Sequence, residues 1–306
     1  MTPPSPQNPG ALNWVLIGSL GVIWGAAFML TSLALDGYGF WTVAAARNLF
    51  GALALWAVCA ALGQPVSGIR STRAWVAIVA IGLGALALPI SLLSWGLQFV
   101  PSAFAGVAMG AVPLLVLPLV ALFSPEEGIG PRRIIGVFLG FAGLALLLGR
   151  EAFAASGRDL EIWGRLACLS AAACYAGGSI ITRRAPKTPP LPFATATLLV
   201  ASLPLVPIAL VMEGLPTAYP TGPTFALILA ALLPTALAAV IRVRVITTAG
   251  SLFMSLTSYQ VPVWSVIFGI ALMGETLPPQ LYGALALILT GIAISQSRNW
   301  GGAKPG

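Results

Sequence analysis

Apolar residues in this chain run in long, nearly uninterrupted stretches, and polar residues are confined to the short gaps between them. A helix needs roughly 20 apolar residues to cross the hydrocarbon core of a bilayer. Ten stretches come close to that length, and we expect each to form a membrane-spanning helix: about 12–34, 40–62, 74–97, 102–122, 132–149, 161–182, 192–212, 224–246, 250–273 and 278–296. The pattern predicts an all-α polytopic membrane protein.

The basic residues are sorted between alternate gaps. If the N-terminus lies inside, the inner side of the membrane holds Arg70, Arg73, Arg132, Arg133, Arg183, Arg184, Lys187, Arg242, Arg244, Arg298 and Lys304. The outer side holds Arg150, Arg158 and Arg165. Eleven bases against three indicate that both termini are cytoplasmic, because short inner loops collect lysine and arginine.

Composition excludes several kinds of function. Hydrophobic residues make up 58% of the 306 residues and charged residues only 8%, with a mean hydropathy of +0.96, whereas soluble domains carry roughly 25% charged residues. The absence of histidine excludes imidazole catalysis and histidine-ligated metal. Since the loops account for the excess of bases, we expect no nucleic-acid partner, and we expect no metal or other cofactor.

The chain contains an internal repeat. Pro113 precedes Glu126 by 13 residues, and Pro262 precedes Glu275 by the same 13, so the two prolines lie 149 positions apart. The glycines that follow align with a one-residue slip. Because five spans is an odd number, the second copy runs opposite to the first, giving two inverted five-helix repeats (5+5). We expect a tail at 1–11, the first repeat at 12–149, an external linker at 150–160, the second repeat at 161–296 and a tail at 297–306.

The repeat also carries a family resemblance. The stretches VIWGAAFMLTSLAL (22–35) and AAARNLFGALAL (44–55), together with the paired prolines and acids, resemble the EamA branch of the drug/metabolite transporter superfamily. Within that branch the chain is similar to the YddG-like bacterial exporters of aromatic amino acids. The resemblance implies the ten-helix fold, location in the bacterial inner membrane and export of small metabolites.

Aromatic and amide side chains within the spans are candidates for binding a substrate. Aromatic walls bind amphiphilic amino acids or organic cations by stacking, apolar burial and cation–π attraction. The aromatic candidates are Trp24, Trp95, Trp163, Tyr175 and Tyr259, and the amide candidates are Gln98 and Gln260. Tryptophans at span ends, such as Trp163, also fit an interfacial aromatic belt, and membrane amides also tie helices together.

Two arginines and two prolines complete the candidate set. Arg47 lies about seven residues inside its span, where an arginine is costly, and it serves either substrate contact or structure and gating. Arg244, at the inner mouth, either attracts a substrate carboxylate or acts only as a topology signal. Pro113 and Pro262 break backbone hydrogen bonds at matched positions and are expected to act as hinges.

Three small-residue runs, Gly21-x3-Gly25, Gly106-x3-Gly110 and Gly136-x3-Gly140, indicate close helix packing rather than a functional site. The acids at helix ends, Glu126, Glu127 and Glu275, are expected to make turn and helix-end contacts with the nearby Arg132 and Arg133. No acid lies convincingly at bilayer depth, where proton-coupled antiporters carry a titratable carboxylate.

These observations favour an alternating-access carrier that exports amino acids, including aromatic and amphiphilic ones, as an uncoupled facilitator and as a monomer. The alternative is an efflux carrier for drug-like organic cations, coupled to protons by an unidentified route. We expect no enzyme, because the spans offer neither a nucleophile–base pair nor metal ligands. A channel would need continuous polar rings, which scattered Gln, Ser and Thr do not make.

Overall fold

The computed structural model describes residues 10–123, 131–148 and 159–296, and the regular secondary structure of that part is entirely helical. The helices are α1 (Ala11–Leu35), α2 (Phe40–Ala61), η1 (Val66–Gly68), α3 (Thr72–Ile81), η2 (Gly82–Ala87), α4 (Leu88–Gly96), α5 (Ser102–Met109), α6 (Val112–Phe123), α7 (Pro131–Leu148), α8 (Asp159–Arg184), α9 (Pro190–Met212), α10 (Thr221–Ala231), η5 (Leu232–Leu237), α11 (Ala238–Met254), α12 (Thr257–Met273) and α13 (Pro279–Gln296). Both η2 and η5 are π-helical turns inside longer helices. The expected helical class is confirmed.

Six helical segments of the described residues are long and apolar enough to cross a membrane: Ala11–Leu35, Phe40–Ala61, Thr72–Gly96, Leu160–Thr182, Pro190–Met212 and Thr221–Ile246. Four further apolar helices are shorter: Ser102–Val116, Ile134–Leu148, Thr257–Met273 and Pro279–Ser295. The chain is therefore a multi-pass membrane protein. Its lipid-facing surface is correspondingly apolar, with side chains such as Phe138 and Leu203 each 72% exposed.

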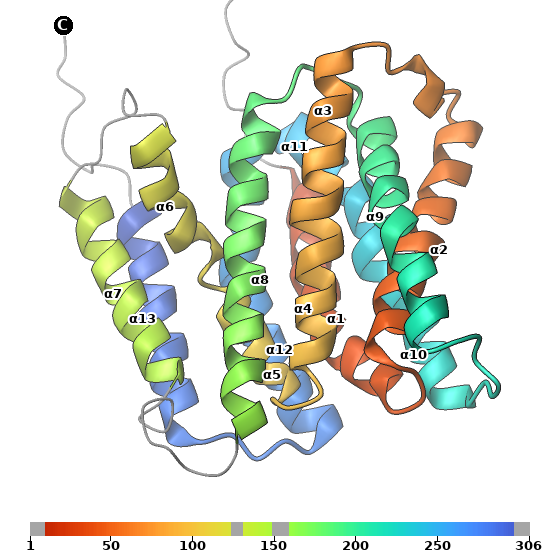
Figure 1. Cartoon of the computed structure of the whole chain (residues 1–306). Coiled ribbons are helices and arrows are strands. Elements are labelled where there is room, and N and C mark those ends of the chain that lie inside the picture. Colours follow the sequence, from red (N-terminus) through yellow and green to blue (C-terminus); the bar gives the residue numbers. More distant parts are fainter. Residues whose placement is uncertain (1–9, 124–130, 149–158, 297–306) are drawn as a thin grey trace, which may run out of the picture.

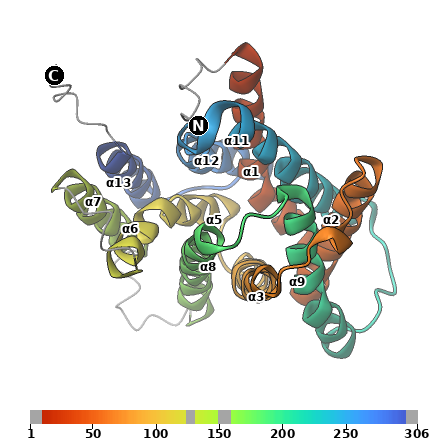
Figure 2. The same ribbon diagram turned by 90° about the horizontal axis from the view of Figure 1, so that it is seen from above.

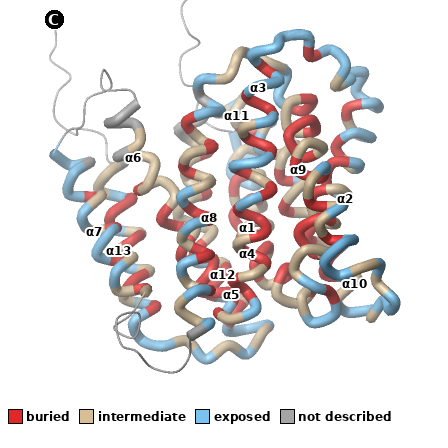
Figure 3. Tube along the Cα trace, in the orientation of Figure 1, coloured by how far each residue is buried: buried red, intermediate tan, exposed pale blue. Residues whose placement is uncertain are grey.

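The helices stand side by side as one bundle (Figure 1). Helix α7 packs along α13 at one edge, and α2 packs along α9 and α10 at the opposite edge (Figure 2). Between these edges, α1 contacts α10, α11 and α12, while α8 contacts α4, α5 and α6. Buried residues line the helix faces that meet one another, and exposed ones line the outer faces (Figure 3).

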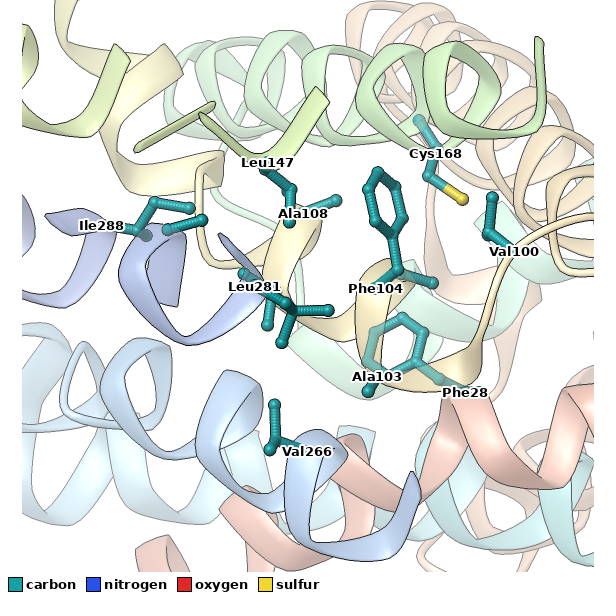
Figure 4. Packing of buried hydrophobic residues seen from close by; sticks show 14 of the residues in the cluster. Phe28, Val100, Ala103, Phe104, Ala108, Leu147, Cys168, Val266, Leu281 and Ile288 are labelled. Atoms are coloured by element: carbon teal, nitrogen blue, oxygen red, sulfur yellow. The ribbon is translucent and has the colours of Figure 1, made fainter. Parts of the chain in front are cut away.

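The largest buried cluster surrounds the short helix α5. The cluster joins Phe104 and Ala108 of α5 to buried side chains from five other helices, among them Phe28 of α1, Leu147 of α7, Cys168 of α8, Val266 of α12 and Ile288 of α13 (Figure 4). Burial of this kind ties together distant parts of the chain, since α1, α5 and α7 lie before residue 149 and α8, α12 and α13 after residue 158.

The three glycine runs lie at helix–helix contacts, as expected. A Cβ added at Gly21 would lie 2.5 Å from Gln260 Oε1, and one added at Gly110 would lie 2.7 Å from Pro262 Cγ. A Cβ at Gly136 would lie 2.5 Å from the carbonyl oxygen of Gly291. Only a residue without a side chain lets these backbones approach so closely.

Two helix boundaries differ from the expectation. The stretch expected as one helix at 102–122 is interrupted at residues 110 and 111, between α5 and α6. The break expected at 247–249 is absent, because α11 continues to Met254 and the helix is interrupted at residues 255 and 256 instead. The segment ITTAGSLFM contains no proline, and a single internal glycine costs a helix only about 1 kcal/mol. Helix α11 therefore continues through residues 247–249. The expected contacts of Glu126 and Glu127 lie outside the described residues.

Candidate functional site

The π turn η5 arises from its proline. Pro234 has no backbone N–H, so it cannot donate to the carbonyl oxygen of Ala230 as a regular α-helical residue would. The hydroxyl of Thr235 donates to that oxygen instead, at 3.1 Å. The carbonyl oxygen of Pro234 in turn accepts from Trp24 Nε1 on α1, at 3.2 Å. The turn therefore presents polar groups inside an apolar bundle, and π turns are frequently found at functional sites.

Arg47 of α2 reaches this turn. Its Nε donates to Thr235 Oγ1 at 3.4 Å, and its Nη1 donates to Thr31 Oγ1 of α1 at 3.1 Å. Thr31 is buried and its hydroxyl also donates to the carbonyl oxygen of Ala27 at 2.6 Å. Gly51, one helical turn beyond Arg47, makes room for the approach, since a Cβ there would lie 2.5 Å from Thr235 Cγ2. Residues from α1, α2 and η5 thus meet at one guanidinium.

The Arg47 guanidinium has donors to spare. Of the five N–H groups of an arginine, two make the hydrogen bonds above, and no carboxylate of the described residues forms an ion pair with it. The phenol of Tyr175 on α8 lies near enough to interact with it electrostatically. Arg165 of α8 provides the contrast, because its Nη2 pairs with Glu161 at 2.5 Å and its guanidinium lies 5.7 Å from the ring centroid of Phe104.

The guanidinium of Arg47 is not fully enclosed by neighbouring side chains. Within the described residues, the sealed side-chain polar atoms that lack a partner are Asn48 Oδ1, Ser94 Oγ and Ser102 Oγ. The Nη2 of Arg47 makes no hydrogen bond either, but it is not sealed, and the residue is only partly buried.

Five of the predicted residues either contact η5 or lie on α8 and α12, which pack against α5. Trp24 is tied to η5, and Gln260 of α12 packs against Gly21, one turn from Trp24 on α1. Tyr175 and Tyr259 both pack, half-buried, against the buried cluster around α5. Together with Arg47 they form the set that we call the central residues: Trp24, Arg47, Tyr175, Tyr259 and Gln260.

A second group lies at the helix ends around residues 96–101. Trp95 packs edge-on against Phe99, with ring centroids 5.0 Å apart, and the exposed Gln98 donates to the Trp95 carbonyl oxygen at 3.3 Å. Helices α4 and α8 cross here, since a Cβ at Gly96 would lie 2.8 Å from the Gly164 carbonyl oxygen. Trp163 adjoins that crossing and is 58% exposed, which suits a place in an aromatic belt.

The remaining predicted residues lie elsewhere. Arg244 is exposed on α11, where its carbonyl oxygen accepts from Thr248 Oγ1 at 2.8 Å. Pro113 follows the interruption between α5 and α6, and the buried Pro262 lies inside α12 against that interruption. The structure thus brings Pro262 close to the break in the fourth apolar stretch, whereas Arg244 stands apart from the central residues.

Sequence reasoning missed Thr31, Thr235 and both π turns. A usable signal was present at Pro234-Thr235, a proline followed by a hydroxyl residue within an apolar stretch. The proline leaves the carbonyl oxygen four residues before it without its usual backbone donor, and the hydroxyl that follows can donate to that oxygen.

The described loop glutamates cap helices. Glu275 accepts from the backbone N–H groups of Ser102 and Ala103 at 2.6 and 3.1 Å, at the start of α5. Its expected helix-end role is confirmed, with α5 as the partner instead of an arginine. Glu213 accepts from the N–H groups of Trp41 and Thr42 at 3.0 and 2.8 Å, at the start of α2. Within the described residues, no three His, Cys, Asp or Glu side chains gather to hold a metal ion.

Comparison with known proteins identifies the class. The EamA-like transporter family model matches residues 12–149 and 162–296. The chain belongs to this family of membrane transporters of small molecules. A protein of known crystal structure shares 21% sequence identity with it and has a TM-score of 0.65, covering 93% of this chain and 97% of its own. At that identity the likeness shows the fold alone. No curated protein is significantly similar in sequence.

Proposed function

We propose that the chain is an alternating-access carrier of ten membrane-spanning helices, arranged as two inverted halves, which exports small amphiphilic metabolites. Amino acids, including aromatic ones, are the foremost substrates. In this proposal the four shorter apolar helices cross the membrane as well, the two halves span residues 12–149 and 161–296, both termini are cytoplasmic, and the carrier is a monomer in the bacterial inner membrane.

The observation that carries the proposal is a pair of close contacts between α7 and α13. Replacing each residue of one contact by its counterpart in the other repeat gives the other contact. A Cβ at Gly143 would lie 3.1 Å from the Ala284 carbonyl oxygen, and one at Gly291 would lie 2.6 Å from the Gly136 carbonyl oxygen. Gly291 lies 148 positions after Gly143, and Gly136 lies 148 positions before Ala284, so one repeat offset converts the first pair into the second. A two-fold axis between inverted repeats produces this reciprocity.

Matched irregularities support the same arrangement. The π turns at 82–87 and 232–237 lie 150 positions apart, and the fourth and ninth apolar stretches are interrupted at 110–111 and 255–256. Contacts are matched too, since η5 packs against α2 and η2 packs against α9. Interrupted helices bend more readily than regular ones, so these interruptions, together with the matched Pro113 and Pro262 two and six residues beyond them, supply the hinges for rocking.

The central residues suit an amphiphilic substrate. Indole and phenol rings bind an apolar or aromatic side chain, while Gln260 and the Arg47 guanidinium offer polar contacts to the backbone groups of an amino acid. Trp95, Gln98 and Trp163 line one mouth of the pathway in this proposal, and Arg244 lines the other. The alternative, an organic-cation efflux carrier, draws on the same aromatic walls through cation–π attraction.

The test is uptake of radiolabelled Trp, Phe, Met and Thr into proteoliposomes, with and without an imposed pH gradient. Saturable uptake that ignores the gradient is the expected result for an uncoupled facilitator. Acceleration by the gradient would contradict the uncoupled mechanism. Uptake of tetraphenylphosphonium, with none of the four amino acids transported, would favour the cation carrier.

A further inference from the structure

The geometry points to Arg47, held between Thr31 and Thr235, as the site that binds the carboxylate of the substrate. The carrier would therefore select molecules with an anionic group over amines of the same shape. This inference rests on the proposed transport function and narrows its substrate class to amino acids and related carboxylates.

The first step is the chemistry of the two threonines. Each hydroxyl has one hydrogen, and both are committed to helix carbonyls, those of Ala27 and Ala230. Each hydroxyl therefore turns only lone pairs toward Arg47, and it holds the guanidinium without neutralising it. The bonds to the two hydroxyls carry a full charge on the arginine side only, whereas a bond to a carboxylate adds attraction between two opposite full charges. A carboxylate thus gains more at this position than the threonines supply.

The second step is the free edge of the guanidinium. The bonds to Thr235 and Thr31 engage Nε and Nη1, which leaves one hydrogen of Nη1 and both hydrogens of Nη2 without a protein acceptor in the described residues. The Nη2 atom is not completely buried, and Arg47 as a residue is partly exposed. The Nη1–Nη2 edge matches the spacing of two carboxylate oxygens, and a bidentate pair at this edge fixes the orientation of the ligand as well as its charge.

The third step is the charge balance of the site. The described glutamates on the loops, Glu213 and Glu275, are hydrogen bonded at helix starts, and Glu161 pairs with Arg165. Within the described chain no carboxylate comes close enough to pair with Arg47. An uncompensated cation in a medium of low dielectric repels other cations and attracts anions. The aromatic rings alone would accept an organic cation, but Arg47 opposes it.

The experiment measures binding of three ligands of one shape to the purified full-length chain by isothermal titration: L-phenylalanine, 3-phenylpropionate and 2-phenylethylamine. The wild type is expected to bind the two carboxylates and to bind the amine at least about 10-fold more weakly. Arg47→Gln is expected to weaken binding of both carboxylates by about 10- to 100-fold, since hydrogen bonds to a charged group are being lost. Binding of the amine should not weaken.

Arg73→Gln is the matched control, because Arg73 is an exposed arginine at the start of α3. Arg47→Lys keeps the charge but loses the planar fork, and we expect it to weaken carboxylate binding by about 3- to 10-fold. It also serves where Arg47→Gln does not fold. The ratio of carboxylate to amine affinity is the diagnostic readout, since a purely structural arginine would change both ligands together.

Three outcomes overturn the inference. The first is unchanged carboxylate affinity in Arg47→Gln or, if that variant does not fold, in Arg47→Lys. The second is a wild type that prefers 2-phenylethylamine. The third is equal weakening of all three ligands. A wild type that neither binds nor transports any of them overturns the proposed function itself, which separates the two failures.

Discussion

The two π turns occupy corresponding places in the bundle, but η5 carries polar groups and η2 carries only apolar side chains. Turn η5 contains Pro234 and Thr235 and receives the side chains of Trp24 and Arg47. Turn η2 reads GLGALA, and at the 149-residue offset Leu86 stands where η5 has Thr235 and Ala196 stands where α2 has Arg47. Leu86 packs against apolar clusters drawn mainly from α2 and α9. A repeated backbone can therefore set shape and motion, while a few unmatched side chains set what is bound.

The irregularities also have different origins. In η5 a proline within the turn removes a backbone donor. In η2 the proline, Pro89, follows the turn, and the turn itself is rich in small residues that let α9 approach. A Cβ at Gly82 would lie 2.8 Å from the Thr197 carbonyl oxygen of α9. One turn is thus specified by a missing hydrogen bond and the other includes a close backbone contact.

Gly82→Ala should disrupt η2, the apolar one of the two π turns, and should lower stability more than the substitutions that follow. The added methyl group overlaps a backbone carbonyl that cannot rotate away, and overpacking of this kind costs about 1–3 kcal/mol. Gly84→Ala is the control within the same turn, because a Cβ there meets nothing within 4 Å. Thermal unfolding in detergent should show a lowered midpoint for Gly82→Ala and an unchanged or slightly raised one for Gly84→Ala. Equal midpoints would contradict the close contact.

Thr235→Val compared with Leu86→Val should sharpen the chemical difference. Loss of the Thr235 hydroxyl leaves the Ala230 carbonyl and Arg47 Nε without a partner, at about 1–2 kcal/mol of stability. Affinity for 3-phenylpropionate should fall about 3- to 10-fold, because the guanidinium is less well oriented. Leu86→Val removes one methylene and should cost about 1 kcal/mol without altering the preference for carboxylates. Indistinguishable ligand profiles for the two variants would remove the functional distinction between the turns.

Trp24→Phe should have the smallest effect. The substitution keeps an aromatic ring on α1 but removes the Nε1–H that donates to the Pro234 carbonyl oxygen. Loss of one such bond costs about 0.5–1.5 kcal/mol. L-phenylalanine affinity should change by less than about 5-fold, measured by titration next to the wild type. A loss comparable to that of Arg47→Gln would transfer the central role from the arginine to the indole.

The sequence predicted the helical class and the packing faces well, because both follow from local patterns. Uninterrupted apolar stretches predict spans, and glycines four residues apart predict close helix contacts such as the one between Gly136 and Gly291. Arg47 was recognised as unusual from its depth alone. Its partners Thr31 and Thr235 were not, since they lie 16 and 188 positions away and meet it only through tertiary packing.

The break expected at 247–249 failed for a related reason. Helix and loop differ little in free energy for a short polar segment with one glycine, so neighbouring helices decide the outcome. Trp95 was likewise indistinguishable from Trp24 by sequence, although the structure places Trp95 at the α4–α8 crossing and Trp24 against η5.

The glutamate caps bear on the electrical character of transport. Glu213 and Glu275 hold the starts of α2 and α5 through backbone N–H groups, so these acids serve as fixed structural anions. Arg47 is an equally fixed charge that stays with the protein. Under the proposed mechanism a zwitterionic amino acid crosses with no accompanying ion and moves no net charge. Membrane voltage would then exert no force on the cycle, and flux would reverse whenever the concentration gradient reversed. Such a carrier releases accumulated metabolite down its concentration gradient and does not transport it against one.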